Sequence, residues 1–97
     1  MKKLRLHAEA EAELAGNLEY YLAVHPDVAD RFFKEITESF GYILRQPKIG
    51  APIDETYRKF VTPHFRYIII YKESAEEVRV DAIGHYSRKP GYWGDRR

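Results

Sequence analysis

The sequence predicts a two-layer α+β domain, in which an antiparallel helix hairpin packs on a small, mostly antiparallel sheet. Apolar residues recur with a helical period over the first half of the chain, and with a period of two over much of the second half. The length of 97 residues suits one domain, residues 1–97. The expected element order is β-α-α-β-β-β.

The first two elements are a short strand and a helix. Residues 2–7 alternate Leu4 and Leu6 with charged neighbours, which indicates a strand. Residues 8–23 change to the helical period, and glutamates crowd the first turns, where negative charge suits the helix dipole. The apolar residues of this helix form one stripe: Ala10, Leu14, Leu18, Tyr21 and Leu22.

A second helix follows after only a few residues. Pro26 suits its first turn, and it ends by Gln46 because Pro47 disfavours helix in the residue before it. The short connection predicts an antiparallel hairpin. The apolar set spans more than one narrow face, so we expect some of it, Phe33 or Phe40, to remain exposed. The full set is Ala29, Phe32, Phe33, Ile36, Phe40, Ile43 and Leu44.

The second half of the chain predicts a loop and three strands. Residues 47–56 contain two prolines and a glycine and indicate a loop. Strands are expected at 57–61, at 65–72 and at 78–83, with a charged turn at 73–76 before the last of them. The middle of the 65–72 segment is apolar on both faces, as in a central strand that is covered on both sides.

Composition excludes several classes of protein. Cysteine is absent, and the four histidines lack the spacing of metal ligands, so neither a disulfide nor a metal site is expected, and no cofactor is implied. No signal-peptide pattern and no long apolar run occur, which predicts a cytoplasmic protein without a membrane partner. The formal charge of +1 divides into −2 over residues 1–46 and +3 over residues 47–97, so the half with most of the sheet is the basic half.

Two motifs carry a family resemblance. They are the strand FRYIIIYKE, residues 65–73, and the segment VDAIGHYSRKPGYWGDR, residues 80–96. Together with the element order, they resemble the RelE/ParE superfamily, the toxins of bacterial type II toxin–antitoxin modules. The second motif is similar to the ParE-like branch, which is called plasmid-stabilisation proteins.

The resemblance implies three alternative functions. ParE-like members inhibit growth by targeting DNA gyrase, and a cognate antitoxin neutralises them as part of a hetero-oligomer. RelE-like members instead cleave messenger RNA on the ribosome without a metal. The third alternative is a non-toxic module that only binds antitoxin. The near balance of charge favours the ParE-like reading, because a ribosome binder is usually strongly basic.

Candidate catalytic residues, if the chain is a nuclease, are Arg66, His85 and Tyr92. Alternation places Arg66 on the face opposite Phe65 and Tyr67, where a phosphate could sit; a solvated arginine or a partner of Asp81 is the alternative. A histidine at the end of the last strand could transfer a proton or fix the C-terminal segment by a hydrogen bond. The tyrosine could act as a general acid or simply pack.

Candidate target-binding residues are the cations of the basic half: Arg58, Lys59, Arg88 and Lys89. Arg58 and Lys59 are adjacent on a strand and so point to opposite faces, which lets only one of them share a site with Arg66. Arg88 and Lys89 could equally form a solvated turn. An exposed Phe33 or Phe40 is expected to receive an amphipathic segment of the antitoxin.

Overall fold

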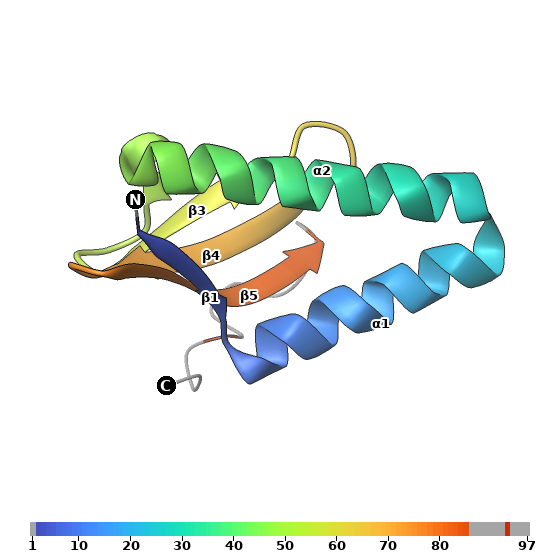
Figure 1. Ribbon diagram of the computed structural model, residues 1–97, viewed down its shortest axis with the longest axis horizontal. Helices are drawn as coiled ribbons and strands as arrows, with labels where there is room; N and C mark the ends of the chain where they lie inside the picture. The colour runs from blue at the N-terminus through green and yellow to red at the C-terminus, as the bar shows by residue number, and fades with distance from the viewer. Residues whose placement is uncertain (1, 86–92, 94–97) are drawn as a thin grey trace.

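The computed structural model describes residues 2–85 and Trp93, and it has the predicted order of elements (Figure 1). The predictions at Arg88, Lys89 and Tyr92 lie outside these residues. Among the helices of the described chain, none has the length and apolar character that crossing a membrane requires. The elements are β1 (Lys3–Leu6), α1 (Ala8–Val24), α2 (Pro26–Arg45), the 3-10 turn η1 (Pro47–Ile49), β2 (Ala51–Pro52), β3 (Tyr57–Val61), β4 (Tyr67–Glu73) and β5 (Glu77–His85).

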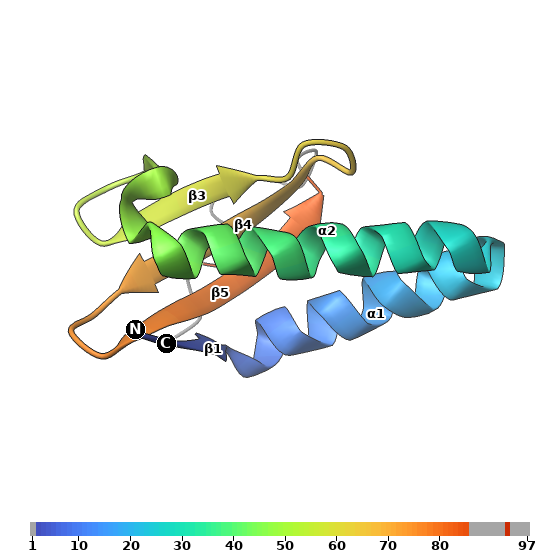
Figure 2. The ribbon, with the colours of Figure 1, turned by 45° about the horizontal axis from the view of Figure 1, so that its top comes forward.

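The five strands form one sheet in the order β1-β5-β4-β3-β2. β1 pairs with β5 in parallel, and the other three pairings are antiparallel, which confirms the mostly antiparallel sheet. The two helices lie together over one face of the sheet, and no helix of the described residues covers the other face (Figure 2). β4 lies in the centre, and Ile69 and Ile70, which point to opposite faces, are both buried, as predicted for a central strand.

A single residue, His25, joins the two helices. Its backbone N–H donates to the carbonyl of Tyr21 at the end of α1, and its Nδ1 accepts the N–H of Asp27 in the first turn of α2, at 3.3 Å. Pro26 occupies the first position of α2, where a missing N–H costs nothing. His7 caps α1 in the same way, accepting the N–H of Glu9 at 3.1 Å. The His25 cap and Pro26 explain why the hairpin turns so sharply, whereas the His7 cap begins α1 at its other end.

The core lies between α2 and the two central strands. Phe32 contributes the largest ring from the helices and contacts Tyr21, Phe65 and Tyr67 with centroid distances of 4.9, 5.4 and 4.9 Å. Such tilted and edge-on ring pairs stabilise a core beyond the area that they bury. The other buried members are Ala10, Ile36, Ile43, Ile69, Tyr71, Val78, Val80 and Ile83.

The segment predicted as a loop, residues 47–56, also contains η1 and the two-residue strand β2. Tyr71 fixes it from below: its hydroxyl donates to the carbonyl of Pro47 at 2.7 Å and accepts the N–H of Gly50 at 2.9 Å. A side chain at Gly50 would lie 2.5 Å from that hydroxyl and 2.8 Å from the carbonyl of Lys59. Glycine is therefore required where the segment crosses the sheet.

Candidate functional site

The flanks of α1 and α2 that face each other carry an exposed apolar surface. Leu22 on α1 is 50% exposed and Phe33 on α2 is 46% exposed. Half-buried leucine and phenylalanine residues lie between these two side chains and the core, so the exposed apolar surface is continuous with the core. We call this surface the apolar band; its residues are Leu14, Leu18, Leu22, Phe33, Phe40 and Leu44.

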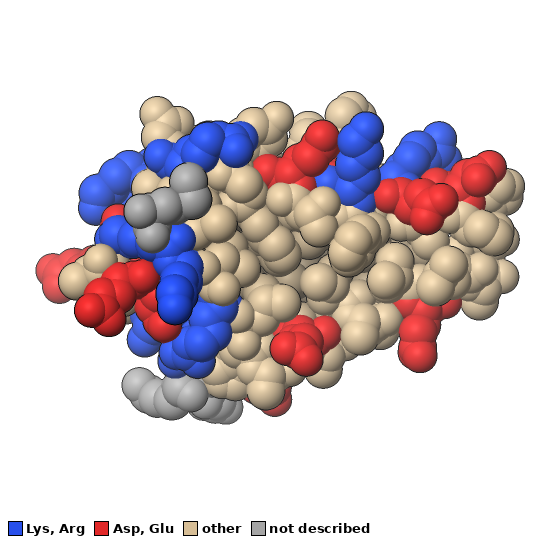
Figure 3. All heavy atoms as spheres, viewed as in Figure 1, with Lys and Arg blue, Asp and Glu red and all other residues tan. Residues whose placement is uncertain are grey.

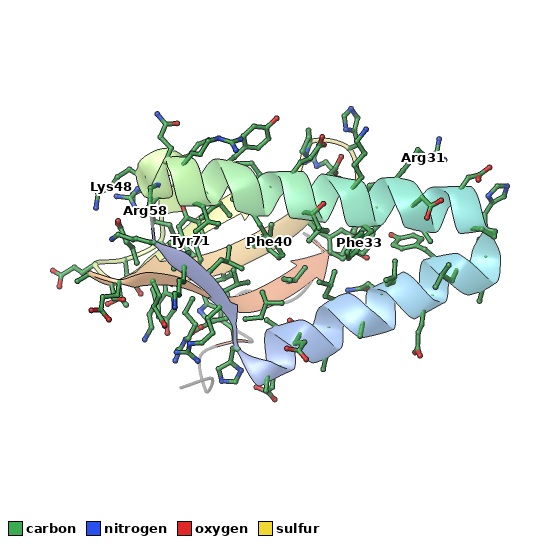
Figure 4. The ribbon with its side chains drawn as sticks, in the orientation of Figure 1. Arg31, Phe33, Phe40, Lys48, Arg58 and Tyr71 are labelled. Atoms are coloured by element: carbon green, nitrogen blue, oxygen red, sulfur yellow. The ribbon has the colours of Figure 1, made fainter. Side chains whose placement is uncertain are left out.

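Figures 3 and 4 show the band from outside. An uncharged surface runs between the two helices across the middle of the molecule (Figure 3). Phe33 and Phe40 lie on the flank of α2 that faces α1 (Figure 4). Phe33 is exposed, whereas Phe40 is half-buried and packs against the core, so both residues named from the sequence lie on this flank but only the first protrudes. An exposed apolar surface of this kind is typical of a docking site.

The end of the sheet near the N-terminus is rich in lysine and arginine (Figure 3). Much of this charge is paired: Glu73 contacts Lys2 at 2.6 Å and Lys48 at 3.4 Å, and Glu77 contacts Arg5 at 2.9 Å. The pairing with Lys2 is the first reason that the pKa of the Glu73 carboxyl lies below its usual range. Positive and negative charges therefore alternate at this end.

Arg58 and Lys59 point to opposite faces of β3, as expected. Arg58 pairs in register with the core residue Tyr71 and so faces the helices, where its guanidinium donates to the carbonyl of Gly50 at 2.8 Å. Figure 4 shows it beside Lys48, at the end of α2. Arg58 thus holds η1 and β2 against the sheet. Lys59 is exposed on the face without helices.

Arg66 and His85 lie at the same end of the sheet. His85 is the last residue of β5, and its Cα pairs with Tyr67, the first residue of β4. The strand predicted over 65–72 begins only at Tyr67, because Arg66 has a φ of 60° and belongs to the preceding turn. The alternation that assigned Arg66 to the open face therefore does not apply. Asp81, its suggested alternative partner, is bound by Arg79 at 2.6 Å.

The turn between β3 and β4 is bound by a residue of α2 that the sequence did not reveal. Glu35 of α2 is only 9% exposed, and its carboxylate accepts the N–H of His64 at 3.0 Å, the N–H of Phe65 at 2.7 Å and a contact from the His64 ring at 2.8 Å. The only sequence signal is a carboxylate inside the apolar stripe, between Phe32 and Ile36. A helix residue thus binds the turn before Arg66.

Acid is expected to destabilise the fold through Glu35. Burial raises the pKa of its carboxyl, but hydrogen bonds from Phe65, His64 and Thr62 outweigh burial and hold the pKa below its usual 4.5. A lowered pKa stabilises the fold above pH 4.5, and this contribution is lost as the pH falls through the folded-state value. Denaturant unfolding of the wild type and Glu35→Gln at pH 7 and pH 3 measures it.

The variant isolates Glu35 from the other groups that titrate. We expect Glu35→Gln to lower the free energy of unfolding by about 1–3 kcal/mol at pH 7, because a buried acceptor is weakened, and by much less at pH 3. Arg31, Lys34, Glu38 and the His64 ring line the same groove and are kept in the variant, in which the His64 ring faces a neutral amide instead of the carboxylate. A difference between the two proteins that is equal at both pH values contradicts the prediction.

The chain is similar to known proteins over most of its length. The model of the ParE toxin family of type II toxin–antitoxin systems matches residues 4–90. Toxin ParE2 of two Mycobacterium tuberculosis strains is 28% identical over 90 residues, covering 92% of this chain and 86% of that protein. A solved chain of the chromosomal ParDE TA system from P. aeruginosa has a TM-score of 0.74 and 17% identity, covering 88% of this chain and 96% of that one. This last likeness concerns the fold alone.

Proposed function

This chain belongs to the ParE toxin family of type II toxin–antitoxin systems, and from that premise we propose that it arrests bacterial growth by acting on DNA gyrase. A cognate antitoxin neutralises it by covering the apolar band, so that the two form a hetero-oligomer in the cytoplasm. The exposure of Phe33 and Leu22 beside half-buried leucines is the observation that carries the antitoxin part of this proposal. An amphipathic segment with apolar residues at helical spacing fits such a surface.

A protein target is supported by the distribution of charge. Binding along a nucleic-acid backbone depends on several cations that neutralise phosphates. At the basic end, the cations of Lys2, Arg5 and Lys48 are instead shared with Glu73 and Glu77. Alternating charges of this kind suit a protein surface of complementary pattern. Of the two adjacent cations of β3, we expect Lys59 to contact the target, since Arg58 is engaged with Gly50.

One observation favours the second candidate function, a metal-independent endoribonuclease. Arg66 and His85 lie at one end of the sheet, where an arginine and an imidazole could act together on a phosphate. Tyr92 is a further candidate for proton transfer. In this alternative the chain catalyses attack of the ribose 2′-hydroxyl on the adjacent phosphate.

Expression of the chain without an antitoxin tests these alternatives. We expect growth arrest with filamentation and double-strand breaks in DNA, and inhibition of supercoiling by purified gyrase. Early loss of intact messenger RNA without DNA breaks would favour the endoribonuclease. Unaffected growth would leave only the non-toxic antitoxin-binding module. The control is co-expression with the antitoxin encoded beside the gene, which should restore growth.

A further inference from the structure

The backbone is strained at one exposed arginine. Among the residues that the structure describes, Arg66 is the non-glycine residue with a positive φ, 60°. This conformation brings Cβ close to the following carbonyl and costs roughly 1–2 kcal/mol for most residues; glycine adopts it readily and asparagine tolerates it. Strain of this kind persists only where the surroundings enforce it, and it concentrates at functional sites.

Glu35 enforces the conformation from the side of the helices. Its carboxylate accepts the consecutive N–H groups of His64 and Phe65, so it fixes the backbone of the two residues before Arg66. Placing a carboxylate where it is nine-tenths buried is costly unless it is fully hydrogen-bonded. The use of a buried carboxylate to close this surface turn therefore indicates that the position of the turn is important.

Thr62 and Phe65 hold the turn from the other side. Thr62 is fully buried; its N–H donates to the carbonyl of Tyr67 at 2.8 Å, and its Oγ1 accepts the N–H of Tyr67 at 2.9 Å. The ring of Phe65 lies 5.4 Å from that of Phe32 and 5.5 Å from that of Tyr21. The turn is thus ordered before and after Arg66, whose side chain is exposed.

We propose that the β3–β4 turn, residues 62–66, holds Arg66 in a fixed position, from which its guanidinium binds a carboxylate on the protein target of the toxin. Glu35 is the positioning residue. The inference rests on the proposed function, since it names the contact through which gyrase is inhibited. A guanidinium binds a carboxylate through two parallel hydrogen bonds, which reward fixed geometry. The nearby groove carries Arg31 and Lys34 but also Glu38, a mixture that suits a protein more than a phosphate backbone.

Two substitutions of Arg66 separate strain from function. Arg66→Gly and Arg66→Asn both remove the guanidinium and suit a positive φ. We expect each to keep a Tm at least equal to that of the wild type and to bind antitoxin within threefold of the wild type. Both should weaken the inhibition of gyrase supercoiling by at least tenfold. Arg45→Ala removes an exposed arginine at the C-terminal end of α2, outside the groove beside the turn; it is the matched control and should inhibit normally.

A double-mutant cycle tests the role of Glu35. If Glu35 acts through Arg66, Glu35→Gln weakens gyrase inhibition in the wild type but has no further effect on it in Arg66→Gly, while it lowers the Tm in both. A purely structural role would instead weaken inhibition equally in both backgrounds. Equal effects would overturn the assignment of Glu35 as a positioning residue.

The other possible outcomes distinguish a failure of the proposed function from a failure of the inference about Arg66. A wild type that does not arrest growth overturns the proposed function and this inference with it. If the wild type inhibits gyrase and Arg66→Gly inhibits it equally well, the inference alone is overturned. An equal loss of inhibition in Arg45→Ala also overturns the inference alone. A wild type that cleaves messenger RNA and loses that activity in Arg66→Gly makes the bound group a phosphate, contrary to the proposal. A Tm that falls by more than a few degrees in both Arg66 variants contradicts the inference that the backbone at Arg66 is strained.

Discussion

Replacing Asp81 with alanine is expected to lower the free energy of unfolding by about 3–5 kcal/mol, because it leaves a buried arginine without its counter-ion. Asp81 is fully buried, and it binds Arg79 through two hydrogen bonds, of 2.6 and 2.9 Å, as well as the hydroxyl of Tyr57 at 3.0 Å. The Arg79 side chain is only 11% exposed. Denaturant unfolding at pH 7 measures the loss.

The position of Asp81 in the sheet explains the size of this effect. The register of β4 and β5 shifts between Ile70 and Tyr71, so that Asp81 is the additional residue of a bulge. The hydrogen bonds that Arg79 donates to Asp81 are also the first cause that raises the pKa of the Arg79 guanidinium. A guanidinium stays protonated even without a partner, so in Asp81→Ala the charge of Arg79 has to be accommodated inside the sheet.

Two variants control this experiment. Asp30→Ala removes an exposed carboxylate and should change the free energy of unfolding by less than about 0.5 kcal/mol. Replacing both members of the pair, Arg79→Met with Asp81→Leu, should recover most of the loss, because no buried charge remains. An Asp81→Ala protein within 1 kcal/mol of the wild type would contradict the importance of the pair.

The order of elements could be predicted from the sequence because it depends on local signals. Helical periodicity, Pro26 and Pro47 bound α2 correctly, and alternation gives β3 in full. The two-residue strand β2 has no periodicity, and it exists because Ala51 and Pro52 pair with the distant β3. A contact of that kind leaves no trace in the segment itself.

The candidate site was predicted only in part, for a similar reason. The sequence named Phe33 or Phe40 as the residue left exposed, since an apolar stripe wider than one face must leave residues outside the core; of the two, Phe33 is the exposed one. It did not reveal that Arg66 leaves the strand, because the cause lies 31 positions earlier in the chain, at Glu35. Nor did it reveal that Arg58 binds the carbonyl of Gly50, since its charge alone indicates no particular partner.

Introducing a charge at Phe33 is expected to separate antitoxin binding from toxicity. Phe33 protrudes from the apolar band, so Phe33→Asp should leave the core intact while an aspartate faces the apolar side of the antitoxin. The loss of a central aromatic anchor typically costs 2–4 kcal/mol of binding energy, which corresponds to a roughly 30- to 1,000-fold rise in Kd. Calorimetric titration with the antitoxin measures this rise, and the variant should still arrest growth when the antitoxin is present.

Tyr42→Asp is the matched control, because it places the same charge on the same helix at equal exposure. Tyr42 is 48% exposed, and its ring lies 6.5 Å from that of Phe60, on the flank of α2 that faces β3. If the antitoxin covers the apolar band, Phe33→Asp loses affinity and Tyr42→Asp keeps it within about threefold. The reverse result would move the antitoxin to the flank that bears Glu35 and the Arg66 turn. Antitoxin and target would then compete directly for one surface. If they bind instead to separate flanks of α2, the antitoxin has to block the target by its size or by distorting the turn.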